Sequence, residues 1–178
     1  MIVKNSERLK FKMITEQDVG FLFDLDQDPE VMRFINGGKT TTLEEVNSIF
    51  IPRLKSYFNR EKGWGLFKIN VQATNEPVGW ILIRPMGFFS ETPEYRNLEI
   101  GWRLFRNTWG KGYATEAAAA VLEAVLQKNK VDFVSALAME QNEASIRMMK
   151  KLGMEFVKKY THEDPLGDEE CVYYRRQV

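Results

Sequence analysis

The chain is poor in the residues from which disulfides and structural metal sites are built. Its 178 residues include one cysteine, Cys171, and one histidine, His162. A single cysteine cannot form an internal disulfide, which is typical of proteins in a reducing compartment. Structural zinc sites need about four cysteine or histidine ligands, so we expect no metal.

An excess of charge, a long apolar run and a signal sequence are also missing. Lys plus Arg and Asp plus Glu both number 25, so the formal net charge is zero, whereas nucleic-acid-binding surfaces usually carry a basic excess. No apolar run reaches the roughly 20 residues of a membrane-spanning helix, and residues 1–11 lack the apolar core of a secretory signal. We therefore expect a cytoplasmic protein with no nucleic-acid partner and no membrane partner.

The spacing of the apolar residues predicts one domain, residues 1–178, of the α+β class. Helical spacing comes first, then alternation with a period of two, and then a strand–helix–strand–helix unit. We expect a mixed, mostly antiparallel central sheet flanked by helices, with Pro52 kinking or splitting the third helix. The expected helices are 15–25, 28–35, 42–57, 114–127 and 142–152, and the expected strands are 67–71, 78–83, 97–105, 131–138, 154–160 and 171–176. Between them, residues 85–93 form a loop that should expose Phe88 and Phe89.

A glycine loop joins the expected strand 97–105 to the alanine-rich helix after it. Gly110 and Gly112 have no Cβ, so the backbone there can approach a ligand closely. The first amides of the following helix have no intrahelical partners, and the helix dipole favours negative charge at that end. The order strand, glycine loop and helix therefore predicts a binding site for a phosphate group.

Two general phosphate motifs do not match the sequence. The dinucleotide fingerprint G-x-G-x-x-G fails because Thr115 stands at its third glycine. The segment Gly38-Lys39-Thr40 looks like the end of a P-loop, but Arg33 stands at its first glycine.

The glycine loop is one of several motifs that together resemble a known family. From Trp109 the chain reads W-G-K-G-Y-A-T-E-A, and from Asn142 it reads N-E-A-S-I-R-M-M-K-K-L-G-M. With E-R-L-K-F-K-M-I-T-E-Q-D from Glu7 and D-P-E-V-M-R-F-I-N-G-G from Asp28, the chain resembles the GNAT superfamily of acyl-CoA-dependent N-acetyltransferases. The closest likeness is to the branch of the ribosomal-protein N-terminal acetyltransferases. The resemblance implies a GNAT-like fold and direct transfer of an acetyl group from acetyl-CoA, the co-substrate, to a primary amine in a ternary complex.

The resemblance also implies where the cofactor binds. Backbone amides of the glycine loop would hold the pyrophosphate, an amide of the strand at Trp102 to Leu104 would donate to the thioester carbonyl, and Asn142 would contact the pantetheine arm. Asn142 has a simpler alternative role as the cap of its own helix. Trp109 departs from the family's Gln or Arg. The loop residues in question are Trp109, Gly110, Lys111, Gly112, Tyr113 and Ala114.

Glu99 and Ser145 are the candidate catalytic residues. Many family members have a tyrosine acid at the position of Met149, one helical turn from Ser145, and the resembling branch is thought to use a serine instead. Ser145 could equally support the helix start. Glu99 could act as the base through water or pair with Arg103 as an ordinary strand glutamate, and His162 is the second candidate base. Glu116 should serve the helix dipole.

The acceptor and the oligomeric state are open at this point. A protein N-terminus, a polyamine and a small-molecule amine all fit as acceptors. The segments 34–42 and 88–95 would line the acceptor site, but their sequences do not indicate which amine binds there. Two acidic groups could attract a cationic amine or could simply be solvated. They are Glu163, Asp164, Asp168, Glu169 and Glu170, and Asp24, Asp26 and Asp28. Monomer and homodimer are both possible.

Two other functions compete with catalysis. The tyrosine missing at Met149 and the unusual Trp109 would also suit a non-catalytic acyl-CoA-binding sensor or interaction module. A nucleotide-binding protein could use the same glycine loop.

Overall fold

A computed structural model describes residues 1–162 and 169–178, and its centre is a seven-stranded sheet. The strand order is β1-β2-β3-β4-β5-β7-β6, and every neighbouring pair is antiparallel except β4 and β5. The α+β fold with a mostly antiparallel sheet is thereby confirmed. The strands are β1 (Leu9–Met13), β2 (Gly65–Val71), β3 (Pro77–Met86), β4 (Glu94–Leu104), β5 (Phe133–Ala138), β6 (Glu155–His162) and β7 (Glu169–Gln177).

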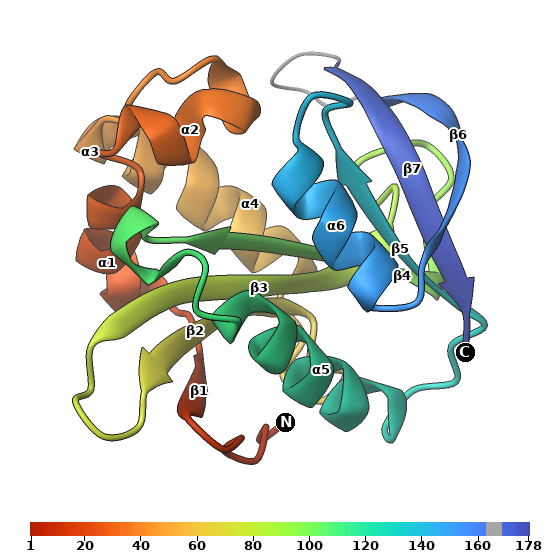
Figure 1. The fold of residues 1–178 in the computed structure, drawn as a ribbon, viewed down its shortest axis with the longest axis horizontal. Helices are drawn as coiled ribbons and strands as arrows, with labels where there is room; N and C mark the ends of the chain where they lie inside the picture. The colour runs from red at the N-terminus through yellow and green to blue at the C-terminus, as the bar shows by residue number, and fades with distance from the viewer. Residues whose placement is uncertain (163–168) are drawn as a thin grey trace.

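Helices cover both faces of the sheet. On the near face in Figure 1 lie α5 and α6, whereas α4 lies behind the sheet. Because side chains alternate along a strand, Ile81 and Ile83 join the core under α5 while Leu82 joins the core under α1 and α4. The helices are α1 (Val19–Leu25), α2 (Pro29–Asn36), α3 (Leu43–Glu45), α4 (Ile51–Tyr57), α5 (Tyr113–Leu126) and α6 (Glu143–Lys151).

The helix expected over 42–57 is divided, as predicted from Pro52. A π-helical turn, Val46–Phe50, separates α3 from α4. The amide of Ile51 donates to the carbonyl of Val46, five residues back. Pro52 has no N–H to continue the α-helical bonding pattern, so the chain changes its hydrogen bonding just before it.

Two expectations about local structure are wrong. The first strand, β1, was not predicted. Its segment L-K-F-K-M does alternate, but it is only five residues long and pairs with β2, about 60 residues away. Phe88 and Phe89 are not exposed. Both rings pack edge-on against Tyr57, with centroids 5.7 and 6.2 Å from it, because α4 covers the loop after β3.

The sheet opens between β4 and β5. These parallel strands pair only over Asn97–Glu99 and Phe133–Ser135. Beyond Glu99, β4 continues toward α1, whereas β5 runs toward the top of the view beside α6 (Figure 1). Within the described part of the chain, Ile100–Leu104 therefore has a strand partner only on its β3 side.

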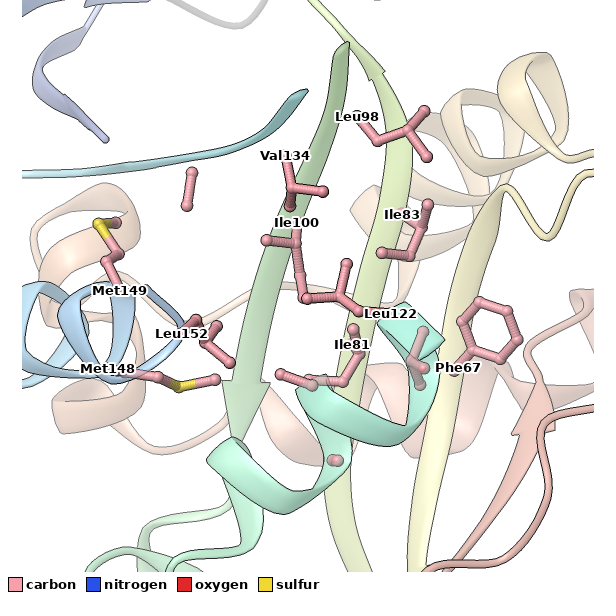
Figure 2. Packing of buried hydrophobic residues seen from close by; sticks show 14 of the residues in the cluster. Phe67, Ile81, Ile83, Leu98, Ile100, Leu122, Val134, Met148, Met149 and Leu152 are labelled. Atoms are coloured by element: carbon pink, nitrogen blue, oxygen red, sulfur yellow. The ribbon is translucent and has the colours of Figure 1, made fainter. Parts of the chain in front are cut away.

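The core next to this opening is filled from α5 and α6. Figure 2 shows Met148, Met149 and Leu152 of α6 on the side of the core that contains Ile100 of β4 and Val134 of β5.

None of the described helices is long and apolar enough to cross a membrane.

Candidate active site

The glycine loop has the backbone shape of an anion cradle. Gly110 and Gly112 have φ values of +74° and +78°, the left-handed region that side chains with a Cβ rarely adopt. Gly112 is the N-cap of α5, and the first intrahelical bond runs from the Glu116 amide to its carbonyl at 3.2 Å. The amides of residues 113–115 are therefore left without intrahelical acceptors. The glycine turn and the unpaired amides that the sequence predicted are thus found at the positive end of a 14-residue helix.

Trp109 fixes the loop to the end of β4. Its indole Nε1 donates to the carbonyl of Leu104 at 2.9 Å, while 47% of the side chain stays exposed. The hydroxyl of the preceding Thr108 is buried and donates to the carbonyl of Phe105 at 2.6 Å. The side chains of Lys111 and Arg106 are exposed at the rim. Trp109 is thus held in place by its indole and by its own amide, which donates to the carbonyl of Arg106 at 3.2 Å.

A second anchor of the cradle comes from the N-terminal segment and was missed from the sequence. Arg8 bonds the carboxylate of Glu116 through Nε at 2.7 Å and donates from Nη1 to the carbonyl of Lys111 at 3.0 Å. The hydroxyl of Ser6 donates to the same carboxylate at 2.7 Å. Partial burial opposes ionisation of Glu116, but the bonds from Ser6 and Arg8 outweigh it and lower the pKa below 4.5. Glu116 is therefore structural, as expected, with partners more than 100 residues away.

Replacing Glu116 with glutamine should destabilise the protein at neutral pH. Bonds to a charged group contribute about 1.5–3 kcal/mol each, so we expect a net loss of about 1–2 kcal/mol in the free energy of unfolding at pH 7. Because the folded-state pKa is depressed, this stabilisation is present above the ordinary value of 4.5 and is lost as the pH falls through the folded value. Urea unfolding of both proteins at several pH values checks this. A difference that persists at low pH would contradict the assignment.

At the opening of the sheet, β4 and α6 are joined by polar contacts. The side chain of Asn142 accepts from the amide of Ser145 at 3.1 Å, so Asn142 caps α6. The indole of Trp102 on β4 donates to the hydroxyl oxygen of Ser145 at 3.3 Å. Met149, one turn further, is fully buried. The structure thus brings Trp102, Asn142 and Ser145 together.

Glu99 is buried and paired, but not with the residue that the sequence suggested. Its carboxylate accepts from Nε and Nη2 of Arg84 on β3, at 2.7 and 3.1 Å. Arg103 instead bonds Asp26 at 2.6 Å. The alternative of a solvent-facing Glu99 paired with Arg103 is wrong because Arg84 is directly opposite Glu99 in the β3–β4 register.

Comparison with known proteins identifies the family of this fold and site. Residues 8–155 match the family described as the acetyltransferase (GNAT) domain. The chain belongs to the GNAT acetyltransferase family. It is accordingly an acetyl-CoA-dependent N-acetyltransferase.

Individual relatives and solved structures are similar to this chain over most of its length. The uncharacterised protein YkkB of Bacillus subtilis is 32% identical over 160 residues, which cover 86% of this chain and 85% of YkkB. A solved GNAT-family acetyltransferase from Bacillus anthracis matches with a TM-score of 0.75 at 28% identity, covering 99% of this chain and 98% of that one. RimL, a ribosomal L7/L12 alpha-N-protein acetyltransferase solved with coenzyme A, matches with a TM-score of 0.76. At 16% identity, over 100% of this chain and 98% of that one, the likeness to RimL supports the fold.

Behind Glu99, the acetyltransferase has an aromatic and cationic cluster that the sequence did not reveal. The guanidinium of Arg84 lies 5.7 Å from the ring centre of Tyr57 and 5.3 Å from that of Phe89. Burial raises the pKa of Tyr57 to about 12, so its phenol stays protonated at neutral pH. These side chains come from β3, α4 and the loop after β3, and only the tertiary fold assembles them.

Cys171 of the acetyltransferase is unsuited to be a nucleophile. Burial, followed by nearby carboxylates that include Glu169 and Glu99, raises the pKa of its thiol to about 11. The thiol is therefore protonated at neutral pH, and the thiolate is the reactive form. This chemistry agrees with direct transfer rather than an acetyl-cysteine intermediate.

The acidic residues divide into structural and cavity-lining groups. The carboxylate of Asp26 accepts hydrogen bonds from Arg103 and Thr41, and Asp28 is the N-cap of α2. Glu163, Asp164 and Asp168 lie outside the described residues. A cavity of about 350 Å³ at the ends of β5, β6 and β7 is lined by Met139, Glu140, Gln141, Lys159, Glu169, Glu170, Cys171 and Val172.

The second candidate base, His162, is the last residue of β6 rather than part of a loop. It is opposite Glu169 of β7, and its ring centre is 6.3 Å from that of Tyr160. The structure thus places His162 on the β6–β7 hairpin, whereas Glu99 is on β4.

Proposed function

We propose that this acetyltransferase transfers the acetyl group of acetyl-CoA to a primary amine by direct attack in a ternary complex. The observation that carries the proposal is the position of the glycine cradle directly after β4, the strand that is unpaired on its β5 side from Ile100 to Leu104. A pyrophosphate bound at the cradle would allow the pantetheine arm to run along that free strand edge. The cradle would use the backbone amides of Gly110, Lys111, Gly112, Tyr113 and Ala114, whereas the amide of Trp109 already donates to the carbonyl of Arg106 at 3.2 Å.

The free edge of β4 also suits the activation of the thioester. An amide of the segment Trp102 to Leu104 would donate to the thioester carbonyl, where negative charge develops during attack. The side-chain amide of Asn142 keeps donor capacity after its oxygen has capped α6, so it can also meet the pantetheine arm. Capping and cofactor contact are therefore compatible.

Proton transfer is the more demanding part of the chemistry. A lysine-type amine has a pKa of about 10.4 and a peptide α-amine about 7.7–8.0, so the acceptor must lose a proton, whereas a thiol with a pKa near 8.5 leaves readily as thiolate. We propose that Glu99 accepts the proton through a water molecule. Its two oxygens offer about four acceptor sites, of which the bonds from Arg84 use two.

Replacing Glu99 with glutamine should lower kcat by about 100-fold, the lower end of the usual contribution of general base catalysis. The acidic limb of the pH–rate profile should change as well. CoA release measured with a thiol reagent across the pH range checks both effects. Glu155→Gln, at the exposed start of β6, is the control and should leave rate and profile unaltered. A normal profile for Glu99→Gln would remove Glu99 from the proton path, with His162 as the next residue to substitute.

The acceptor class is the finer part of the proposal. We propose the branch of the ribosomal-protein N-terminal acetyltransferases, in line with the overall match to RimL. Segments 34–42 and 88–95 would line the acceptor side, with Phe88 and Phe89 now seen to pack on Tyr57. A screen of peptides, polyamines and aminoglycosides for amine-dependent CoA release tests this. Tight CoA binding in calorimetry without release by any amine would favour a sensor over an enzyme.

The proposal also covers domain organisation, compartment, assembly and partners. We propose that residues 1–178 act as one domain in the cytoplasm, as a monomer or a homodimer, without nucleic-acid or membrane partners and without a metal. Sedimentation with and without CoA measures the oligomeric state.

A further inference from the structure

The contact between Trp102 and Ser145 decides which way the serine hydroxyl can act. An indole N–H can only donate a hydrogen bond, so in the 3.3 Å contact the oxygen of Ser145 must accept. A serine hydroxyl has one proton and two lone pairs. The proton of Ser145 therefore remains available for another acceptor.

No such acceptor is present among residues 1–162 and 169–178. The hydroxyl of Ser145 donates no hydrogen bond there, and its backbone amide is already held by Asn142 at 3.1 Å. Met149, one turn further along α6, is fully buried and carries no hydroxyl. The serine is thus fixed from two sides, and its proton is free to meet a ligand between β4 and α6.

We propose that Trp102 is a positioning residue that directs the hydroxyl proton of Ser145 toward the sulfur of CoA. The inference rests on the proposed function, because it requires the pantetheine arm to lie along β4. When the amine nitrogen bonds the acetyl carbon, the C–S bond breaks and its electron pair stays on sulfur. Ser145 then donates a hydrogen bond to the thiolate and keeps its proton, while the amine proton leaves through the base. The β4 segment that begins at Trp102 would thus donate an amide to the thioester carbonyl, and the indole of Trp102 would orient Ser145 toward the sulfur.

The complex with CoA tests this without any knowledge of the acceptor. The bound thiol is titrated by its thiolate absorbance in the ultraviolet, with the desulfo-CoA complex as the blank. Cys171, with a pKa raised by burial to about 11, titrates above the range in question. A hydrogen bond to the charged form lowers a pKa, so the wild-type midpoint should lie below the free thiol value of about 8.5.

Five variants separate positioning from mere packing. Ser145→Ala should raise the midpoint by about one unit, the equivalent of one charge-assisted hydrogen bond. Trp102→Phe should raise it by a similar amount, and the double variant should not exceed either single one, because both remove the same bond. Ser145→Thr should keep the wild-type midpoint. Trp80→Phe, a tryptophan that packs against the core on the opposite face of the sheet, should keep it too.

Each outcome decides a separate question. An unchanged midpoint in Trp102→Phe, additive shifts in the double variant, or loss of CoA binding in Trp102→Phe alone would overturn the positioning role. Failure of the wild-type protein to bind CoA would instead overturn the proposed function.

Discussion

Arg84→Met is expected to lower the free energy of unfolding by about 3–5 kcal/mol, because it leaves the buried carboxylate of Glu99 without its charged partner. Arg84 and Glu99 are each only 8% exposed, and both guanidinium contacts are within hydrogen-bond distance. In the variant this largely buried carboxylate would have no cation to balance its charge. Urea unfolding followed by circular dichroism measures the loss.

The matched control is an ion pair of the same type at the surface. Arg96 pairs with Asp132, with 67% and 45% of the two side chains exposed, and pairs of this kind contribute about 0–1 kcal/mol. Arg96→Met should therefore change stability little. Combining Arg84→Met with Glu99→Leu should recover most of the loss, since an apolar pair can replace a buried ionic one. Equal losses for Arg84→Met and Arg96→Met would contradict this account of the pair.

Gly112→Ala is expected to raise the KM for acetyl-CoA about tenfold, which corresponds to about 1.4 kcal/mol of binding free energy. The added Cβ has room, since its nearest neighbour would be Nη2 of Arg8 at 3.5 Å. The φ of +78° is the obstacle, because a left-handed conformation costs a residue with a Cβ about 1–2 kcal/mol. The loop would relax and turn its amides away from the pyrophosphate. Steady-state kinetics with acetyl-CoA varied measures the effect.

Gly153→Ala separates the loss of the cradle from general backbone strain. Gly153 ends α6 with a φ of +77°, and its added Cβ would meet only Cδ of Arg176, at 3.9 Å. Both variants should lose similar stability, whereas only Gly112→Ala should change the KM. A similar rise of KM in both would mean that the glycine loop is not the pyrophosphate site.

The sequence predicted the features that depend on local patterns. The cap at Asn142, the break at Pro52 and the glycine loop before α5 follow from the chemistry of single residues and their neighbours, and all three are present. Alternation along β2 was equally legible, because the burial of its residues alternates. Strands β3 and β4 have longer buried stretches, because helices cover both faces of the sheet there.

The features that were missed depend on contacts between distant segments. Arg8 and Glu116 are 108 residues apart, and nothing near either residue identifies the other. The structural alternative for Glu99 paired it with Arg103 of its own strand, but the cross-strand register placed Arg84 opposite it. The exposure of Phe88 and Phe89 was misjudged for a similar reason, because a loop sequence does not reveal which helix covers it.

The short pairing of β4 with β5 leaves an open edge in the middle of the sheet rather than at its border. Unpaired strand edges attract other strands and promote aggregation, and proteins usually protect them. Here the unpaired segment is Ile100–Leu104, between β3 and the start of the glycine loop. The pantetheine arm of acetyl-CoA contains amide groups and, as proposed above, would pair with this edge as an additional strand does. Acetyl-CoA would then protect the protein in addition to serving as its substrate. Loss of the bound co-substrate would expose the strand edge to other chains.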